Sequence, residues 1–230
     1  MQARRLIVGA LVAFLVAGGL VRAVLIPSQQ DLALPEALIA LDSPEGQRLL
    51  DSSRSADFEP LTQHFQPQRY GSYCGVASSV VALRALGVEV SQDRFFSSEA
   101  RQVRARYQVM FGGMPLDDLG GLLSAHGAVT AVHHTAESSL DAFRQAAADN
   151  LSQPGDVVIV NYHRPVLGQQ GGGHISPLAA YAPDSDRFLV LDTASYKYPP
   201  TWVRAVDLWD AMDTVDADGG ETRGFVLVSR

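Results

Sequence analysis

The chain has a single cysteine, Cys74, among its 230 residues. It therefore cannot form an internal disulfide, and a folded domain must depend on its apolar core, which a 47% apolar composition can supply. The sequence also has no block of basic residues, and its formal net charge of −7 argues against nucleic acid as a partner. It contains no internal repeat and no low-complexity tract. These absences leave one globular domain of substantial size as the expectation.

The sequence also lacks an unbroken apolar run of the roughly 20 residues that a membrane-spanning helix needs. The longest such run near the N-terminus covers residues 6–21 and follows Arg4 and Arg5. This order is typical of the basic and apolar regions of an export signal. If the charged end of Arg22 extends to the membrane surface, residues 6–26 could instead remain as an uncleaved anchor.

These observations divide the chain into three expected parts. Residues 1–27 are a signal peptide or an N-terminal membrane anchor, residues 28–42 a linker, and residues 43–230 the folded domain. We therefore expect an exported protein that is either periplasmic or anchored facing the periplasm. Contact with the membrane is expected only through residues 1–27, if that segment is not cleaved.

The order of the expected elements predicts an α+β fold. The first two thirds are mostly helical, with a helix beginning at Ser43 and further helical segments at 75–86, 91–107, 114–123 and 138–150. An extended segment is expected at 58–65 and a short strand at 129–133. From residue 154 onwards, β-branched segments predict strands at 156–162, 174–181, 187–192 and 224–228, with a short helix near 206–212. A helical lobe is thus followed by an antiparallel β-sheet lobe.

Cys74 opens the apolar run that ends at Gly87, so its thiol is expected at the N-terminus of a buried helix. The unpaired N–H groups and the helix dipole at that end favour a thiolate, which is a nucleophile. The alternative is an inert cysteine that packs the start of the helix, because free cysteines are among the most buried residues.

A nucleophilic thiolate needs a base, and the base needs an acceptor that orients it. His174 follows three glycines and begins a strand, and Asp192 ends an apolar strand, where a carboxylate needs a partner. Taken alone, His174 could be a loop residue and Asp192 a turn residue. The order Cys, His, Asp matches papain-like enzymes. Gln68 could donate an N–H to a developing oxyanion beside the Cys74 amide.

The remaining histidines lack a metal-ligand spacing supported by cysteines or carboxylates. They are interpreted as surface or core-edge residues, and no metal site is assigned to His64, His126, His133, His134 and His163.

Three motifs resemble those of phytochelatin synthases. Residues 68–78 are similar to the family's nucleophile motif, residues 160–178 to its histidine motif and residues 191–203 to its aspartate motif, and residues 223–225 resemble its closing strand. The match runs from about Ser43 to the C-terminus. The resemblance implies a papain-like fold.

The resemblance also implies the catalytic residues and the reaction. Cys74, His174 and Asp192 would form the triad, with Gln68 in the oxyanion hole. Cys74 would cleave glycine from glutathione through a γ-glutamylcysteinyl thioester. Hydrolysis of that thioester gives γ-glutamylcysteine, and transfer to a second glutathione gives a phytochelatin. No tightly bound cofactor is implied; a heavy-metal ion such as cadmium would enter as a glutathione thiolate complex.

A glutathione site needs one charge of each sign for the γ-glutamyl head. Arg223 is assigned to the carboxylate and Asp216 to the ammonium, and Gly173 and Tyr198 complete the expected substrate site. Glutathione and related γ-glutamyl thiols are the expected partners, and a homodimer is left open.

Two departures from the family pattern favour hydrolysis over transfer. Ser195 stands where the family usually has an arginine, and the chain ends at Arg230 without the cysteine-rich region of the plant members. Both features resemble the short bacterial members. Two alternatives stay open: a papain-like peptidase or transferase acting on another γ-glutamyl or short peptide, and a non-catalytic module that binds thiols or metal thiolates.

Overall fold

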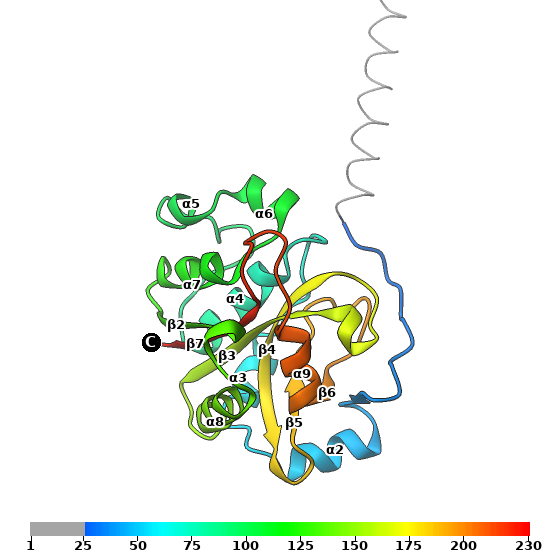
Figure 1. Cartoon of the computed structure of the whole chain (residues 1–230). Coiled ribbons are helices and arrows are strands. Elements are labelled where there is room, and N and C mark those ends of the chain that lie inside the picture. Colours follow the sequence, from blue (N-terminus) through cyan, green and yellow to red (C-terminus); the bar gives the residue numbers. More distant parts are fainter. Residues whose placement is uncertain (1–25) are drawn as a thin grey trace, which may run out of the picture.

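The computed structural model describes residues 26–230, so the expected signal peptide or anchor, residues 1–27, lies almost wholly outside the described residues. Within the described part, seven antiparallel strands form one sheet in the order β1-β6-β5-β4-β3-β7-β2 (Figure 1). The strands are β1 (Ile39–Ala40), β2 (Val129–His134), β3 (Asp156–His163), β4 (Gly173–Ala182), β5 (Arg187–Val190), β6 (Thr201–Arg204) and β7 (Gly224–Ser229). The sheet and its helices confirm the expected α+β class.

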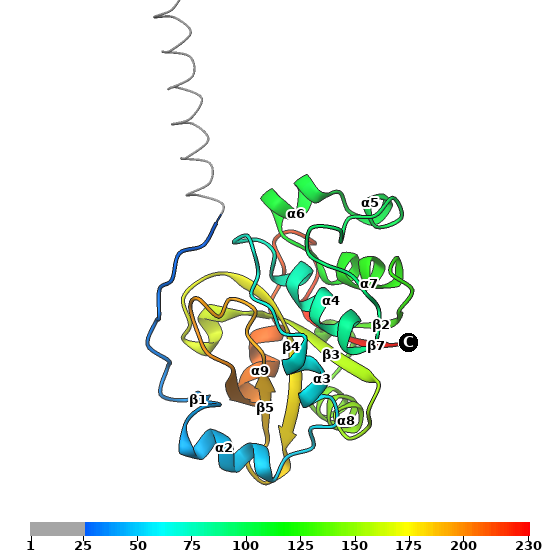
Figure 2. The ribbon, with the colours of Figure 1, turned by 180° about the vertical axis from the view of Figure 1, so that it is seen from behind.

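Helices cover both faces of this sheet. One face packs against the longer helices of the first half of the chain, and Figure 2 shows the molecule from that side. The other face packs against α8 and α9. The helices are α2 (Pro44–Asp51), α3 (Phe58–Gln63), α4 (Cys74–Ala85), α5 (Ala100–Val103), α6 (Arg106–Gly112), α7 (Leu116–Ser124), α8 (Leu140–Asn150) and α9 (Ala205–Met212). The sheet is therefore shared between two cores instead of forming a lobe of its own.

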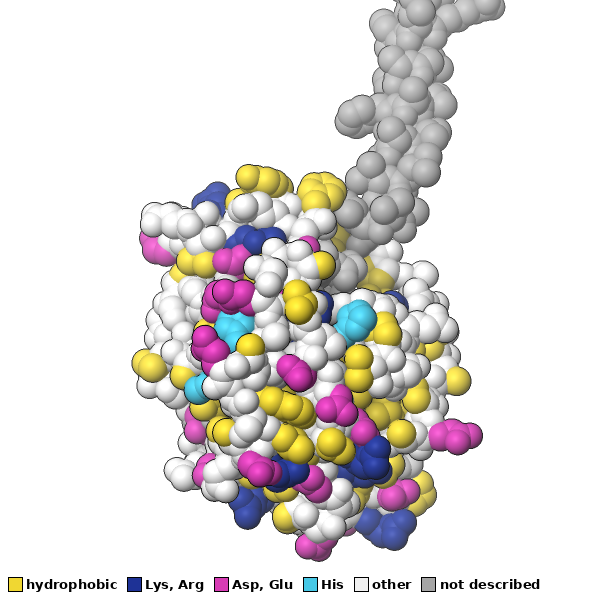
Figure 3. All heavy atoms as spheres, viewed as in Figure 1, with side chains coloured by type: hydrophobic (Ala, Val, Ile, Leu, Met, Phe, Trp, Pro, Cys, Tyr) yellow, Lys and Arg dark blue, Asp and Glu magenta, His cyan; other side chains and the backbone are white. Residues whose placement is uncertain are grey.

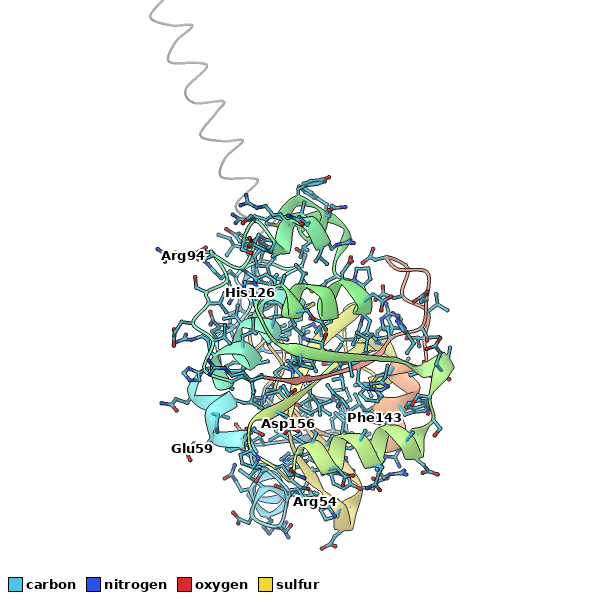
Figure 4. All side chains as sticks on the ribbon, turned by 90° about the vertical axis from the view of Figure 1, so that its left-hand side faces the viewer. Arg54, Glu59, Arg94, His126, Phe143 and Asp156 are labelled. Carbon is cyan, nitrogen blue, oxygen red and sulfur yellow. The ribbon has the colours of Figure 1, made fainter. Side chains whose placement is uncertain are left out.

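The inner strand β3 contributes to both cores by alternation along the strand. Val157 and Ile159 belong to the core on the α4 side, whereas Val158 and Val160 belong to the core on the α8 side. Phe143 of α8 is fully buried against that second face, where it meets the ring of Phe225 at a centroid distance of 5.1 Å (Figure 4). The removal of both faces of β3 from water holds the site-bearing strands β3 and β4 in a fixed register.

Helix α4 forms as the sequence predicts. Its residues 75–83 are all buried, which agrees with an apolar composition all round the helix. The helix ends just before Gly87, whose φ of +80° is a conformation that favours glycine. The expected N-cap of α2 is also confirmed, because Ser43 Oγ accepts a hydrogen bond from the Gly46 amide at 3.0 Å.

Three local predictions are wrong. Residues 58–65 are not extended: most of them form α3, because Leu61 packs fully buried in the α4 core. Helix α8 is capped by Ser139 rather than by Ser138, since a short 3₁₀ turn precedes it. Residues 91–107 are mostly irregular, and only α5 and the start of α6 are helical there. In the irregular part, the carbonyl oxygen of the buried Phe95 accepts a hydrogen bond from a histidine ring.

The segment expected as a linker, residues 28–42, is part of the folded domain. Its strand β1 pairs with β6, and Leu38 is buried in the second core. Further upstream, the amide of Gln30 donates to the carbonyl oxygen of Tyr196 at 2.8 Å. These contacts could not be predicted from the sequence, because β1 has only two residues and pairs with a strand more than 150 residues further along the chain. No helix within residues 26–230 is long and apolar enough to cross a membrane.

Candidate active site

Cys74 and His174 come from two elements that lie side by side. Cys74 is the first residue of α4, and His174 is the second residue of β4. The buried hydroxyl of Ser78, one turn into α4, donates to the carbonyl oxygen of Ile175 at 2.9 Å and so ties the helix to the strand beside the two side chains. Cys74 stays partly exposed, as a nucleophile must.

Asp192 lies two residues after β5 and faces the imidazole of His174. Oδ1 of Asp192 is 2.8 Å from Nε2 of His174, and both residues are at least 95% buried. The oxygen lies off the direction of the N–H, so the contact is an ion pair rather than a well-aligned hydrogen bond. The ring of Tyr162 meets the imidazole edge-on at a centroid distance of 5.6 Å and limits its rotation.

The three groups shift one another's pKa values in the directions that favour an ionised pair. Burial would raise the pKa of the Cys74 thiol, but hydrogen bonding to His174 and its charge outweigh burial and lower that pKa. Burial and the charge of Arg164 lower the pKa of His174, yet Asp192 and Cys74 together raise it by more. Burial opposes the ionisation of Asp192, but His174 and Arg164 hold its pKa well below the ordinary range. The arrangement therefore stabilises a thiolate beside an imidazolium.

Arg164 is a further member of the site that the sequence interpretation missed. Its Nη2 donates to both carboxylate oxygens of Asp192, at 2.8 and 2.7 Å, and its Nη1 donates to Gln169 Oε1 at 2.9 Å. The guanidinium lies over the ring of Tyr198 at 5.3 Å from the centroid. Because Arg164 is 2% exposed and touches Asp192 instead of the cavity, it is a positioning residue.

A cavity of about 330 Å³ opens beside Cys74 and His174. Arg223, Asp216 and Asp218 are the Arg and Asp side chains that line it, and Nη2 of Arg223 lies 3.4 Å from Oδ1 of Asp216. Arg223 is anchored by a hydrogen bond from Nη1 to the Val215 carbonyl at 2.7 Å, and its Nε is a buried donor without a partner among the described residues. Asp216 also accepts from Asn161 Nδ2 at 2.9 Å. The cavity thus offers charges of both signs near the thiol, with Arg223 and Asp216 as the anchored pair.

Gly173 lies in the cavity wall, and Tyr198 does not. A Cβ at Gly173 would come within 2.9 Å of Nη2 of Arg223, so glycine is what lets the guanidinium lie against β4. Tyr198 is 2% exposed, and its hydroxyl accepts a hydrogen bond from the Gln170 amide at 2.8 Å. It lies behind the triad, under Arg164, and acts on the site only through that arginine.

Gln68 does not offer a free donor. Its Nε2 donates to the carbonyl oxygens of Tyr70 and Gly71, at 3.0 and 2.8 Å, and these two bonds use both hydrogens. Since carbonyl oxygens can only accept, the amide must be oriented in this way. In this arrangement Gln68 holds the loop before Cys74, and the first amides of α4 are the donors left for an oxyanion.

Arg164 and Asn161 could have been found from one signal in the sequence. Both follow or end the β-branched run of β3, where a polar residue needs a buried partner. The partners, Asp192 and Asp216, lie 28 and 55 residues further along the chain. Nothing local in the sequence indicates which carboxylate each would meet.

Comparisons with known proteins show which family the chain resembles along most of its length. The family model described as phytochelatin synthase matches residues 29–225. The chain is 34% identical over 212 residues to glutathione gamma-glutamylcysteinyltransferase 1 of Arabidopsis thaliana, covering 88% of this chain and 44% of that protein.

A second relative comes from a fungus. Glutathione gamma-glutamylcysteinyltransferase of Schizosaccharomyces pombe is 26% identical over 208 residues, covering 85% of this chain and 50% of that protein. The chain therefore spans about half the length of the curated relatives it matches, or somewhat less. The motifs of the sequence resemble those of the same family. The family match over residues 29–225 and these relatives show that the chain belongs to the phytochelatin synthase family.

Proposed function

We propose that this chain is a glutathione γ-glutamylcysteinyltransferase that acts mainly as a glutathione hydrolase. One observation carries the proposal: the oppositely charged pair Arg223 and Asp216 lines the same cavity as Cys74. The γ-glutamyl head of glutathione carries a carboxylate and an ammonium on one carbon atom, and this pair complements both. The names of the relatives support the same substrate.

The first half of the reaction forms a thioester. The Cys74 thiolate attacks the carbonyl carbon of the cysteinyl-glycine bond, and the N–H groups at the start of α4 stabilise the negative oxygen. His174 then gives its proton to the glycine nitrogen, the C–N bond breaks and glycine leaves. Asp192 stabilises the imidazolium while that proton is held.

The second half of the reaction decides the product. Water attacks the thioester carbonyl, and His174 takes a proton from that water. The bond to the Cys74 sulfur breaks, and γ-glutamylcysteine is released. If the amine of a second glutathione attacks in place of water, the product is a phytochelatin. Ser195, which stands between the aspartate loop and β6, offers no charge to hold a second glutathione. Hydrolysis is therefore the main outcome that we propose, and a heavy-metal ion would enter only as a thiolate complex of glutathione.

Two wider proposals accompany this function. A nucleophile on a buried helix facing a histidine on an antiparallel sheet supports a papain-like arrangement. The apolar run 6–21 after Arg4 and Arg5 supports export, with the domain in the periplasm or anchored facing it.

The test uses two isomers of one tripeptide. The full chain is incubated with glutathione or with the α-glutamyl isomer, which places the same two charges differently, and free glycine and the intact protein mass are measured. We expect glycine from glutathione only, with a transient γ-glutamylcysteinyl adduct. The Cys74→Ala variant should lose both.

A matched variant tests the charged pair separately. Gly173→Ala displaces the guanidinium of Arg223 and should raise KM for glutathione, while alkylation of Cys74 by iodoacetamide stays at the wild-type rate. Equal release of glycine from both isomers would make the protein a peptidase of broader specificity. No glycine from either would exclude the proposed reaction and favour a module that only binds thiols.

A further inference from the structure

A cluster outside the catalytic cavity joins three side chains that are distant in the sequence. Asp117 lies in the first turn of α7, His134 ends β2, and Glu221 lies just before β7. One ligand atom from each lies within 4.8 Å of the other two. We propose that Asp117, His134 and Glu221 bind a divalent cation of the zinc class.

The histidine is already oriented as a metal ligand. Nδ1 of His134 lies 2.5 Å from the carbonyl oxygen of Thr222, and a carbonyl can only accept, so Nδ1 carries the hydrogen. In the neutral ring Nε2 then holds the lone pair. A ring N–H donated to a backbone carbonyl is the usual way in which a metal-binding histidine is fixed in one tautomer and one orientation.

Each carboxylate lies at the distance from the imidazole nitrogen that two ligands of one small cation would have. Nε2 of His134 is 3.3 Å from Oδ1 of Asp117 and 3.3 Å from Oε2 of Glu221. Two ligands bound at about 2.0–2.2 Å in a tetrahedron are separated by roughly 3.3–3.5 Å. Both carboxylates are exposed on one side, so a water molecule can take the fourth position.

The chemistry of the donors selects the ion. One imidazole nitrogen and two carboxylate oxygens suit Zn²⁺ or a similar borderline ion, whereas soft ions prefer thiolate, which the cluster lacks. The only cysteine is in the catalytic cavity. This site would therefore discriminate between zinc and an ion such as cadmium, which thiol groups bind well.

The surrounding charge favours a cation. The cluster lies in a hollow of about 300 Å³ lined by one arginine, Arg104, and by five carboxylates: Asp117, Asp118, Asp216, Asp218 and Glu221. Arg104 is paired with Asp118 at 2.6 Å. Figure 3 shows acidic side chains gathered beside a histidine on this face.

The cation would fix a segment that also builds the catalytic cavity. Residues 213–223 carry Glu221 to the cluster, and they carry Asp216 and Arg223 to the cavity. The segment is closed by hydrogen bonds from the Asp216 amide to the Glu221 carbonyl and from the Gly220 amide to the Asp216 carbonyl, both 2.7 Å. A metal ion that joins Glu221 to α7 and β2 therefore also restricts the movement of Arg223 and Asp216 in the cavity. This site does not depend on the proposed reaction.

The experiment measures zinc binding to the full chain after treatment with a chelator. We expect one Zn²⁺ per chain by equilibrium dialysis and elemental analysis at pH 7.5, and binding that is at least about tenfold weaker in Glu221→Gln and in Asp117→Asn. Glu137→Gln is the matched control, because it removes an exposed carboxylate three residues after His134 and outside the cluster. Equal zinc affinity in all four proteins would overturn the proposal.

Two further readouts separate this site from zinc bound elsewhere on the chain. Cys74→Ser should keep its zinc; loss of zinc in that variant would mean that the catalytic thiol holds the ion, and would overturn the site. Hydrogen exchange of amides 214–222 should slow on addition of Zn²⁺ in the wild type and not in Glu221→Gln. Zinc bound at full affinity without slower exchange would refute the coupling to the cavity. A thermal melt of each variant checks that it is folded.

Discussion

Replacement of Arg164 by methionine should be among the most destabilising single changes in this protein. The guanidinium makes two hydrogen bonds to Asp192, at 2.8 and 2.7 Å, and both residues are 2% exposed. Methionine keeps an unbranched side chain of similar length but leaves the Asp192 carboxylate with only the Ala194 amide, at 2.8 Å, and His174 as partners. The variant therefore removes one buried charge, together with the hydrogen bond from Arg164 to Gln169.

The magnitude follows from the burial. Removal of one partner from a buried ion pair typically costs about 3–5 kcal/mol of unfolding free energy. For a domain of this size that corresponds to a fall in Tm of roughly 6–20 °C. The matched control is Arg204→Met, which deletes an arginine bound to Asp207 at 2.6 and 2.7 Å but half exposed. An exposed pair contributes only about 0–1 kcal/mol.

Urea unfolding of the two variants and the wild type measures the difference. The pKa of Asp192 is depressed in the folded protein, so its contribution is present above the unfolded pKa of about 3.9 and is lost as the pH falls below that value. The gap between the wild type and Arg164→Met should therefore narrow below about pH 4. If Arg164→Met costs no more than Arg204→Met at pH 7, Asp192 does not depend on the buried guanidinium and the reasoning fails.

Three further predictions concern other parts of the molecule. The alkylation rate of Cys74 in the wild type should follow a thiol pKa below that of an ordinary cysteine. His174→Ala should raise that pKa above the wild-type one, because burial alone raises it; an unchanged midpoint would contradict the pairing. Burial and a neighbouring carboxylate raise the pKa of Asp156 to about 6, so its charge destabilises the fold at pH 7.5. At pH 7.5, Asp156→Asn should raise the free energy of unfolding by about 1 kcal/mol, a value that already allows for solvent screening. Denaturation measured at several pH values should show that this gain is gone below about pH 4. Gly224→Ala places a Cβ 2.0 Å from a backbone carbonyl of β2 and should cost roughly 1–3 kcal/mol, whereas Gly71→Ala, which meets nothing within 4 Å, should cost under about 0.5 kcal/mol in the same assay.

Features that depend on neighbouring residues could be predicted from the sequence. The run after Cys74 is dominated by Ala, Val and Leu, and that composition is enough to indicate a buried helix. The Ser43 cap needs only the next three residues, and the strand that begins near His174 is visible in its β-branched composition. Cys74, His174 and Asp192 could be selected as candidates because each lies at or close to the end of such an element.

Features that depend on distant partners could not be predicted in this way. His134 is an ordinary strand residue until the carboxylates of Asp117 and Glu221 are placed beside it, 17 and 87 residues away in the chain. Gln68 has the right residue type for an oxyanion donor, but two backbone carbonyls in its own loop use its hydrogens. Pairings of this kind are set by the packing of the whole sheet.

The pairing of β1 with β6 has a practical consequence for any shortened form of the protein. A chain trimmed to begin at Ser43, where the sequence motifs begin, would lose β1 and leave Thr201–Arg204 as the outermost strand. The N–H and C=O groups of that strand would then be unpaired at the edge of the sheet, which is a template for aggregation. A shortened chain beginning near residue 28 retains the cover on this edge and should be the soluble one.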